Sequence, residues 1–352
     1  MPGKIELAQP LKTYLLGYPL QHSLAPLLHS TIYKEANVPW TYQIVETQDK
    51  DGFIPTLKSD DCIGSAVTMP FKVTFMKECD EVTEEGRAIG AINTVFIRRD
   101  PATGCKKYIG TNTDCVGVRE AFVQNFPNIL ELSTGKPALV IGGGGACRSA
   151  VYALYKWLGA SEIYLVNRIK EEVDDIIASF AAIPGGGPKL RHVSAIEEIV
   201  ARDISVEFLK KSQKGYVLEM CYHPNIVTEF YKTAEDNGWQ VIPGTESMIY
   251  QGIAQQVLWM EKPSDQIPSE AMVPKGLPCC ITDRDACVCK RPRVDDNSSD
   301  VGPCLMDSVD YSTLVVGLEG VKLRAERCGM LFRFLFELGE RRVAVDMRFP
   351  ET

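Results

Sequence analysis

The chain has 352 residues, of which 45% are hydrophobic, enough to build the cores of two ordinary domains. Its formal net charge is −8, so no basic face dominates, which argues against a general nucleic-acid binder. No run of 18 apolar residues occurs, and no transmembrane helix or membrane partner is expected. The start, MPGKIELAQP, carries charges where a signal peptide needs an apolar core. We therefore expect a cytoplasmic protein whose twelve cysteines are reduced.

Strands and helical segments alternate through the first 70 residues. Residues 13–17 (TYLLG) read as a short buried strand that a glycine closes. Residues 24–36 place leucine and isoleucine at helical spacing, and residues 40–46 and 62–69 read as further strands. This alternation predicts an α/β architecture with parallel strand pairing.

The clearest local signal lies at residues 137–168. An apolar strand at 137–141 runs into four glycines and then a helical segment, and a second strand follows at 163–168. Glycines let a backbone approach a pyrophosphate closely, and a helix N-terminus offers unpaired N–H groups to it. In the dinucleotide-binding fingerprint, the third glycine position falls on Cys147. The candidate cofactor-binding residues here are Gly142, Gly143, Gly144, Gly145 and Ala146.

The residues after the second strand bear on the choice of cofactor. Asn167, Arg168 and Lys170 stand where an acid would bind the ribose hydroxyls of NAD, so NADP is favoured. Glu171 and Glu172 follow at once and would weaken a phosphate site, so NAD stays open. Arg168 and Lys170 could equally be solvent-exposed residues at the start of a helix.

The last third of the chain changes in character. Residues 181–189 read as a loop, and 215–219 and 239–242 as short strands. From about residue 263, scattered prolines and a group of five cysteines appear, whose spacing is poor for zinc. Residues 329–338 (GMLFRFLFEL) are apolar enough to be buried, against a partner that the sequence does not identify.

Several stretches now occur together in one order: GYPLQHSLAPLLHS, VTMPFK, GAINTV, GTNTDCVG, IGGGGACR, LVNR, EMCYHPNIVTEF and GTESMIYQGIAQQVLW. In this combination, from about residue 13 to 260, the chain resembles the shikimate and quinate dehydrogenase family. The resemblance implies an N-terminal α/β substrate domain and a Rossmann-like NAD(P)-binding domain. These would be residues 1–113 with 245–262, and residues 114–244, followed by a C-terminal extension at 263–352. It also implies an oxidoreductase that interconverts shikimate or quinate with the corresponding dehydro acid.

The resemblance gives a role to Lys72 and Asp114 as the catalytic pair beside the hydroxyl that is oxidised. A lysine in a partly desolvated pocket can accept a proton, and a nearby carboxylate orients it and balances its charge. Taken alone, Lys72 would be a surface lysine with a buried stem. Asp114 would equally fit the N-cap of a helix, and both roles can hold together.

The resemblance also implies a substrate site made of Ser23, Ala25, Thr68, Asn93, Tyr222 and Gln251. Without it, Asn93 reads as a turn residue and Gln251 as a helix-surface residue. The family usually has a second serine where this chain has Ala25. The smaller side chain removes a hydroxyl donor from shikimate and makes room for the additional hydroxyl of quinate, so activity on quinate is expected.

Two further interpretations stay open from the sequence: a non-catalytic sensor, and a dehydrogenase of the same fold that acts on an amino-substituted or otherwise altered ring acid. A non-catalytic sensor could keep the same fold to bind the same acids, although it would not need the lysine–aspartate pair together with an open glycine loop. His22 and His29 lack a third ligand at a useful spacing, so no metal is expected. The expected partner is a small-molecule substrate, and nothing in the sequence shows the oligomeric state.

Overall fold

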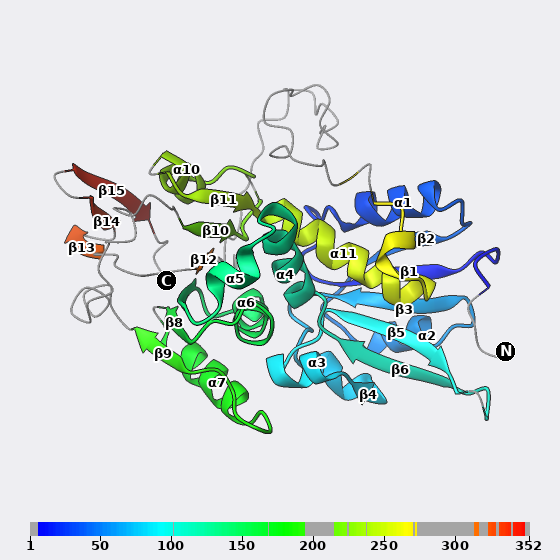
Figure 1. Ribbon diagram of the computed structural model, residues 1–352. Coiled ribbons are helices and arrows are strands. Elements are labelled where there is room, and N and C mark those ends of the chain that lie inside the picture. The colour runs from blue at the N-terminus through cyan, green and yellow to red at the C-terminus, as the bar shows by residue number, and fades with distance from the viewer. Residues whose placement is uncertain are drawn as a thin grey trace, which may run out of the picture.

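The computed structural model describes residues 6–100, 102–167, 169–193, 215–223, 225–236, 238–269 and 272, together with the backbone of four strands beyond residue 312. Two six-stranded sheets and a three-stranded sheet make up its strands (Figure 1). The α/β fold expected from the sequence is confirmed.

The first sheet is built entirely from the first 111 residues. Its strand order is β2-β1-β3-β5-β6-β4. The bounds are β1 Lys12–Gly17, β2 Thr41–Glu46, β3 Cys62–Val67, β4 Glu81–Val82, β5 Thr94–Arg99 and β6 Lys106–Thr111. The short helices around it are α1 Ala25–Glu35, η1 Asp51–Phe53, α2 Ile54–Leu57, η2 Thr74–Glu78 and α3 Glu84–Ile89.

Parallel pairing was predicted correctly for only part of this sheet. β1 lies parallel to both β2 and β3, but β5 runs antiparallel to β3 and to β6. For β5 and β6 the reason is the short connection after Arg99, where Gly104 has a φ of 70°. Such a connection closes a hairpin, whereas a parallel pair needs a crossover of a dozen or more residues.

The second sheet has the order β11-β10-β12-β7-β8-β9. Its strands are β7 Pro137–Ile141, β8 Glu162–Val166, β9 Leu190–Val193, β10 Tyr216–Glu219, β11 Gln240–Pro243 and β12 Thr313–Val316. The helices that accompany it are α4 Asp114–Asn125, α5 Ile129–Ser133, α6 Gly145–Lys156, α7 Lys170–Ala181 and α10 Glu229–Asp236. β7, β8 and β9 are parallel, as are β10 and β11, whereas β12 runs antiparallel to both β7 and β10.

The C-terminal extension therefore supplies an inner strand of the second sheet. Three more of its strands, β13 Leu323–Cys328, β14 Leu331–Leu338 and β15 Arg341–Arg348, form the antiparallel three-stranded sheet. The apolar segment 329–338 thus contributes β14, and its burial lies outside what the structure describes. The cysteine group at 279–304 also lies outside the described residues.

Helix α11, Gly244–Met260, returns from the second sheet to the first, and η3 Ser264–Gln266 follows it. It lies between the two halves of the molecule in Figure 1 and packs on α4. The packing is close, because a Cβ on Gly117 of α4 would collide with the backbone oxygen of Ser247. At its far end, Trp259 is fully buried and donates from Nε1 to the carbonyl of Val95 at 3.1 Å. The polar residues near the middle of α11 therefore lie between the two sheets.

Candidate active site

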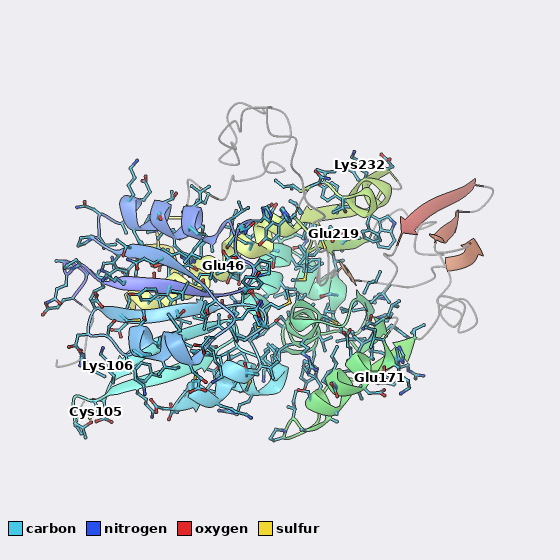
Figure 2. The ribbon with its side chains drawn as sticks, turned by 180° about the vertical axis from the view of Figure 1, so that it is seen from behind. Glu46, Cys105, Lys106, Glu171, Glu219 and Lys232 are labelled. Atoms are coloured by element: carbon cyan, nitrogen blue, oxygen red, sulfur yellow. The ribbon has the colours of Figure 1, made fainter. Side chains whose placement is uncertain are left out.

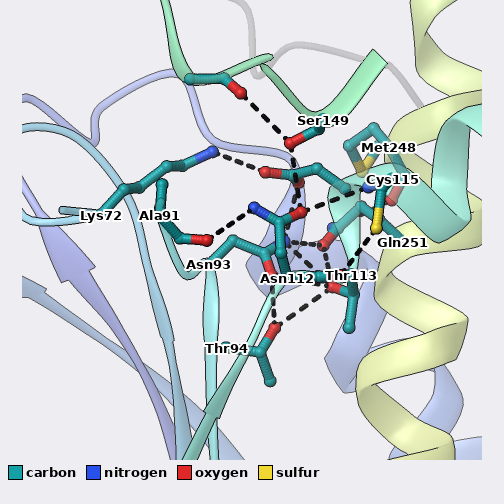
Figure 3. Close-up of polar contacts among 12 residues, drawn as sticks. Lys72, Ala91, Asn93, Thr94, Asn112, Thr113, Cys115, Ser149, Met248 and Gln251 are labelled. Carbon is teal, nitrogen blue, oxygen red and sulfur yellow. Dashed lines mark hydrogen bonds and ion pairs between the residues drawn. The ribbon is translucent and has the colours of Figure 1, made fainter. Parts of the chain in front are cut away.

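The candidate catalytic residues meet where the two halves of the molecule join. Lys72 follows β3, Asn93 immediately precedes β5, and Asp114 opens α4. Gln251 reaches the same place from α11. Figure 3 shows how the side chains of Lys72, Asn93 and Gln251 converge, although they come from three separate segments.

Lys72 and Asp114 form an ion pair. Lys72 Nζ lies 2.7 Å from Asp114 Oδ2, and the two side chains are only 23% and 18% exposed. The other carboxylate oxygen of Asp114 accepts a hydrogen bond from Asn93 Nδ2 at 2.7 Å. Lys72 is therefore not a solvated surface lysine, and its ammonium group is oriented by a partner that is itself held in place.

The side chain of Asp114 does not cap its helix. The N-cap residue of α4 is Thr113, whose side chain makes no capping bond. Asn112 Oδ1 instead accepts from the backbone N–H of Cys115 at 3.3 Å. Asp114 thus directs both carboxylate oxygens toward the site, which is the arrangement that the catalytic reading requires.

Asn93 is the centre of the hydrogen-bond network and is only 4% exposed. Its Oδ1 accepts from the backbone N–H of Thr113 at 2.6 Å and from Thr94 Oγ1 at 2.8 Å. Its Nδ2 also lies 3.2 Å from Gln251 Oε1, whose own Nε2 donates to the carbonyl of Met248. Asn93 is thus a buried member of a hydrogen-bond network rather than a turn residue, and Gln251 is part of the same network.

The glycine loop lies directly beside this network. Gly142 has a φ of 128°, a conformation suited to glycine, and α6 begins at Gly145. A Cβ on Gly145 would lie 3.5 Å from Cδ of Lys72, so the start of α6 faces Lys72. Cys147, at the third fingerprint position, is buried and donates from Sγ to the carbonyl of Gly142 at 3.3 Å. The loop therefore presents the N-terminus of α6 next to the Lys72–Asp114 pair.

The residues expected to determine the cofactor preference, Asn167, Arg168 and Lys170, do not share one set of contacts. Asn167 Nδ2 donates to Glu172 Oε2 at 2.6 Å, and both groups lie so close to Gly143 that a Cβ there would collide with them. Lys170 pairs with Asp174 at 2.5 Å on the exposed side of α7. Arg168 lies outside the described residues.

Ser23 and Thr68 lie on the loops that follow β1 and β3, and Ala25 begins α1. Ser23 Oγ accepts from the backbone N–H of Ala25 at 3.3 Å, at the start of α1. A Cβ on Gly17 would collide with Cγ2 of Thr68, which places Thr68 against the loop that leads to Ser23.

Tyr222 lies near the catalytic pair on the other side of the site. Burial raises its pKa, and the negative charge of Asp114 adds to the effect, while Lys72 opposes it. Its hydroxyl therefore stays protonated as a hydrogen-bond donor. Next to these loops, the rings of His22 and His223 stack with centroids 4.1 Å apart.

Neither a metal site nor a membrane-spanning helix is seen within the described ranges. No group of three or more metal-ligating side chains gathers there. No helix of that part of the chain is long and apolar enough to cross a bilayer.

Comparison with known proteins assigns the chain to a family. Residues 15–95 match the family model of the shikimate dehydrogenase substrate binding domain. Quinate dehydrogenase from Emericella nidulans is 38% identical over 301 residues, which cover 74% of this chain and 91% of that protein. The chain belongs to the shikimate and quinate dehydrogenase family. The resemblance seen in the sequence is confirmed.

Solved structures of shikimate and quinate dehydrogenases share the fold. Shikimate 5-dehydrogenase from Thermus thermophilus, in complex with NADP(H) and shikimate, is 25% identical with a TM-score of 0.56, over 73% of this chain and 97% of that one. Quinate dehydrogenase from Corynebacterium glutamicum, in complex with NAD, has a TM-score of 0.61 over the same shares, and at 22% identity it shows the fold alone. Structures of this fold thus hold a nicotinamide cofactor of either kind.

Sequence reasoning missed three polar residues that complete this family site. Thr113 bonds Asn93 and Gln251, and Asn112 Nδ2 donates to the carbonyl of Ala91 at 3.1 Å. Ser149 on α6 donates to Asn112 Oδ1 at 3.1 Å and so links the cofactor side to the catalytic network. The available signal was the polar run TNTD directly after a strand, which is too long to be explained by one helix cap.

Proposed function

We propose that the protein is an NAD(P)-dependent dehydrogenase that interconverts quinate with 3-dehydroquinate, shikimate with 3-dehydroshikimate, or both. The observation that carries the proposal is the 2.7 Å Lys72–Asp114 pair facing the glycine loop. A hydroxyl dehydrogenase needs a proton acceptor within reach of the carbon that loses hydride. The relation to quinate dehydrogenase over most of the chain supports the same chemistry.

In the oxidative direction, Lys72 would take the proton of the ring hydroxyl. The bound nicotinamide would accept the hydride from the carbon that carries this hydroxyl, leaving a ketone. Asp114 stabilises the ammonium form of Lys72 that proton transfer produces, and Asn93 fixes Asp114 in the required orientation. In reduction the same lysine returns the proton to the oxygen.

The substrate acid would lie between the two halves, with its carboxylate near Ser23 and Tyr222. The protonated hydroxyl of Tyr222 can donate to a carboxylate. Thr68, Asn93 and Gln251 would contact the ring hydroxyls. Ala25 leaves space at the carboxylate-bearing carbon, which supports activity on quinate.

The proposed division of the chain follows from this site. Residues 1–113 with 245–262 would hold the substrate, and residues 114–244 would hold the cofactor. The packing of Trp259 against Val95 supports assigning α11 to the substrate domain. The extension from residue 263 is not separate from the cofactor domain, because β12 pairs with β7 and β10.

A nicotinamide dinucleotide would bind along the loop Gly142–Gly145 and Ala146. The sequence favours NADP through Arg168 and Lys170, whereas in the structure Lys170 is paired with Asp174. The free thiols of Cys62, Cys79, Cys105 and Cys115 support a reducing, cytoplasmic location.

The test is the absorbance of the reduced nicotinamide with purified protein, using quinate and shikimate each with NAD and with NADP. We expect turnover with at least one pair, and Lys72→Ala should reduce kcat by about 10²–10⁴-fold, as loss of a general base does. Lys107→Ala, which removes an exposed lysine on β6 of the first sheet, is the matched control and should keep full activity.

The alternative of a non-catalytic sensor makes the opposite prediction. Folded protein that binds one of the acids but gives no turnover in any of the four mixtures would overturn the dehydrogenase proposal. No contact in the described part of the site favours the sensor, since the lysine, the aspartate and the open loop are all in place.

A further inference from the structure

A carboxylate lies against the glycine loop of the cofactor domain. Glu172 stands in the first turn of α7, and its Oε2 accepts the hydrogen bond from Asn167 Nδ2 at 2.6 Å. A Cβ on Gly143 would collide with this same Oε2. The carboxylate therefore occupies the place where the loop, the end of β8 and the start of α7 meet.

Among the described residues, which do not include Arg168, the charges around Glu172 do not neutralise this position. Lys170 is engaged by Asp174 on the exposed side of α7. Arg148 on α6 is influenced by both Asp175 and Glu172, so one guanidinium serves two carboxylates. The first two turns of α7 carry four carboxylates, those of Glu171, Glu172, Asp174 and Asp175. The described cations near them are two, Lys170 on α7 and Arg148 on α6.

We propose that Glu172 is a specificity-determining residue that selects NAD over NADP. The inference rests on the proposed function, since it concerns the cofactor of that same site. In folds of this kind, the adenosine ribose lies at the end of the second strand, beside the glycine loop. A carboxylate there accepts hydrogen bonds from ribose hydroxyls, whereas a 2′-phosphate offers further negative charge and, as a dianion, no donor.

The position of Glu172 thus favours NAD, whereas Arg168 and Lys170 considered alone favour NADP. Lys170 pairs with Asp174, whereas the carboxylate of Glu172, two residues further along the chain, is the one that touches the loop. The selection works through repulsion of the phosphate as well as attraction of the hydroxyls.

The experiment measures the Kd of NAD and of NADP by calorimetry on the full chain, without substrate. We expect NAD to bind at least about tenfold tighter, and Glu172→Gln to shift the Kd ratio toward NADP by about tenfold, because it removes the charge and keeps the shape. Glu171→Gln is the matched control: it removes the same charge from the neighbouring, exposed residue (Figure 2) and should shift the ratio less than about twofold.

A salt titration of the unmodified protein gives a second measurement that needs no variant. If the 2′-phosphate meets net negative charge, raising the salt concentration weakens the discrimination against NADP; if a cation holds it, salt strengthens the discrimination. Tighter binding of NADP by the unmodified chain, or equal shifts in the two variants, would overturn the inference.

Those outcomes leave the dehydrogenase proposal intact as long as quinate or shikimate is turned over with either cofactor. Absence of both nucleotide binding and turnover would overturn the proposed function, and the inference with it.

Discussion

The two six-stranded sheets are assembled in different ways. The first takes all its strands from residues 12–111, so each strand pairs with a near neighbour in the chain. The second takes an inner strand, β12, from residues 313–316, about 70 residues beyond the end of β11 at Pro243. The sheet beside Lys72 is thus drawn from one continuous stretch of the chain, whereas the sheet that carries the glycine loop also depends on a strand from far along the chain.

The pairing register of β12 with its neighbours shows why the origin of this strand matters for cofactor binding. Thr313 of β12 pairs with Ile141, the residue directly before the glycine loop, and on its other side with Glu219. β12 on one side and β8 on the other therefore hold β7 up to the point where the loop begins. A loop that must present N–H groups to a pyrophosphate requires a fixed strand behind it.

The largest effect is expected from Val315→Pro, which tests whether the second sheet depends on β12. Proline removes an N–H in a strand that is paired on both sides, so we expect a loss of about 3 kcal/mol or more in the free energy of unfolding of the cofactor half. Hydrogen exchange should accelerate in β7 and β10 and stay unchanged in β3. NAD affinity should fall in parallel.

Val315→Thr is the control, because it retains the backbone donor. It should leave exchange in β7 and β10 close to that of the unmodified chain. Unchanged protection in Val315→Pro would show that β7 and β10 are held without β12, and the contrast between the two sheets would disappear.

The junction between the sheets can be tested with Asn93→Ala. The substitution leaves the N–H of Thr113 and one oxygen of Asp114 without their partner, so we expect a loss of about 2–3 kcal/mol in the free energy of unfolding. Because Asp114 also loses its orientation, kcat should fall about 100-fold, with a smaller change in KM.

The matched control is Asn128→Ala, which removes an exposed asparagine between α4 and α5. It should change kcat less than about twofold. A large fall in stability with normal kcat in Asn93→Ala would make Asn93 structural only.

The acid sensitivity of the protein should arise in the first half. His29 is fully buried there, and burial lowers its pKa from 6.5 to about 3. Below pH 6.5 the unfolded chain binds a proton that the folded chain does not, so the folded state loses stability as the pH falls toward 3. From pH 7 to pH 5 this residue should cost about 2 kcal/mol of the free energy of unfolding.

Denaturant unfolding at the two pH values, for the unmodified chain and for His29→Gln, measures this contribution. The variant should lose less stability on acidification than the unmodified chain does. Equal pH dependence in the two proteins would contradict the assignment to His29.

The smallest effect expected is on substrate choice at Ala25. Ala25→Ser restores a hydroxyl donor and takes up space, so the ratio of kcat/KM for shikimate over quinate should rise about fivefold, close to 1 kcal/mol. Ala36→Ser, at the other end of α1, is the control and should leave the ratio unchanged. An unchanged ratio in Ala25→Ser would remove this position from the determinants of specificity.

Much of the molecule could be predicted from the sequence, because it depends on local chemistry. The strand 137–141 matches β7 residue for residue, and the helix expected at 24–36 is α1 at Ala25–Glu35. Periodicity and glycine content determine such elements within a dozen residues of chain. The order of the motifs also gave the family, and with it Lys72 and Asp114.

What only the tertiary structure decided are the contacts between distant residues. The hairpin of β5 and β6, the insertion of β12 beside β7, and the use of Asn93 to hold Asp114 depend on pairings that no local pattern encodes. The same holds for Glu172: its charge is evident in the sequence, but its contact with Gly143 results from the packing of α7 against the loop. Local propensity chooses the elements, and burial and hydrogen bonding between them choose which side chains meet.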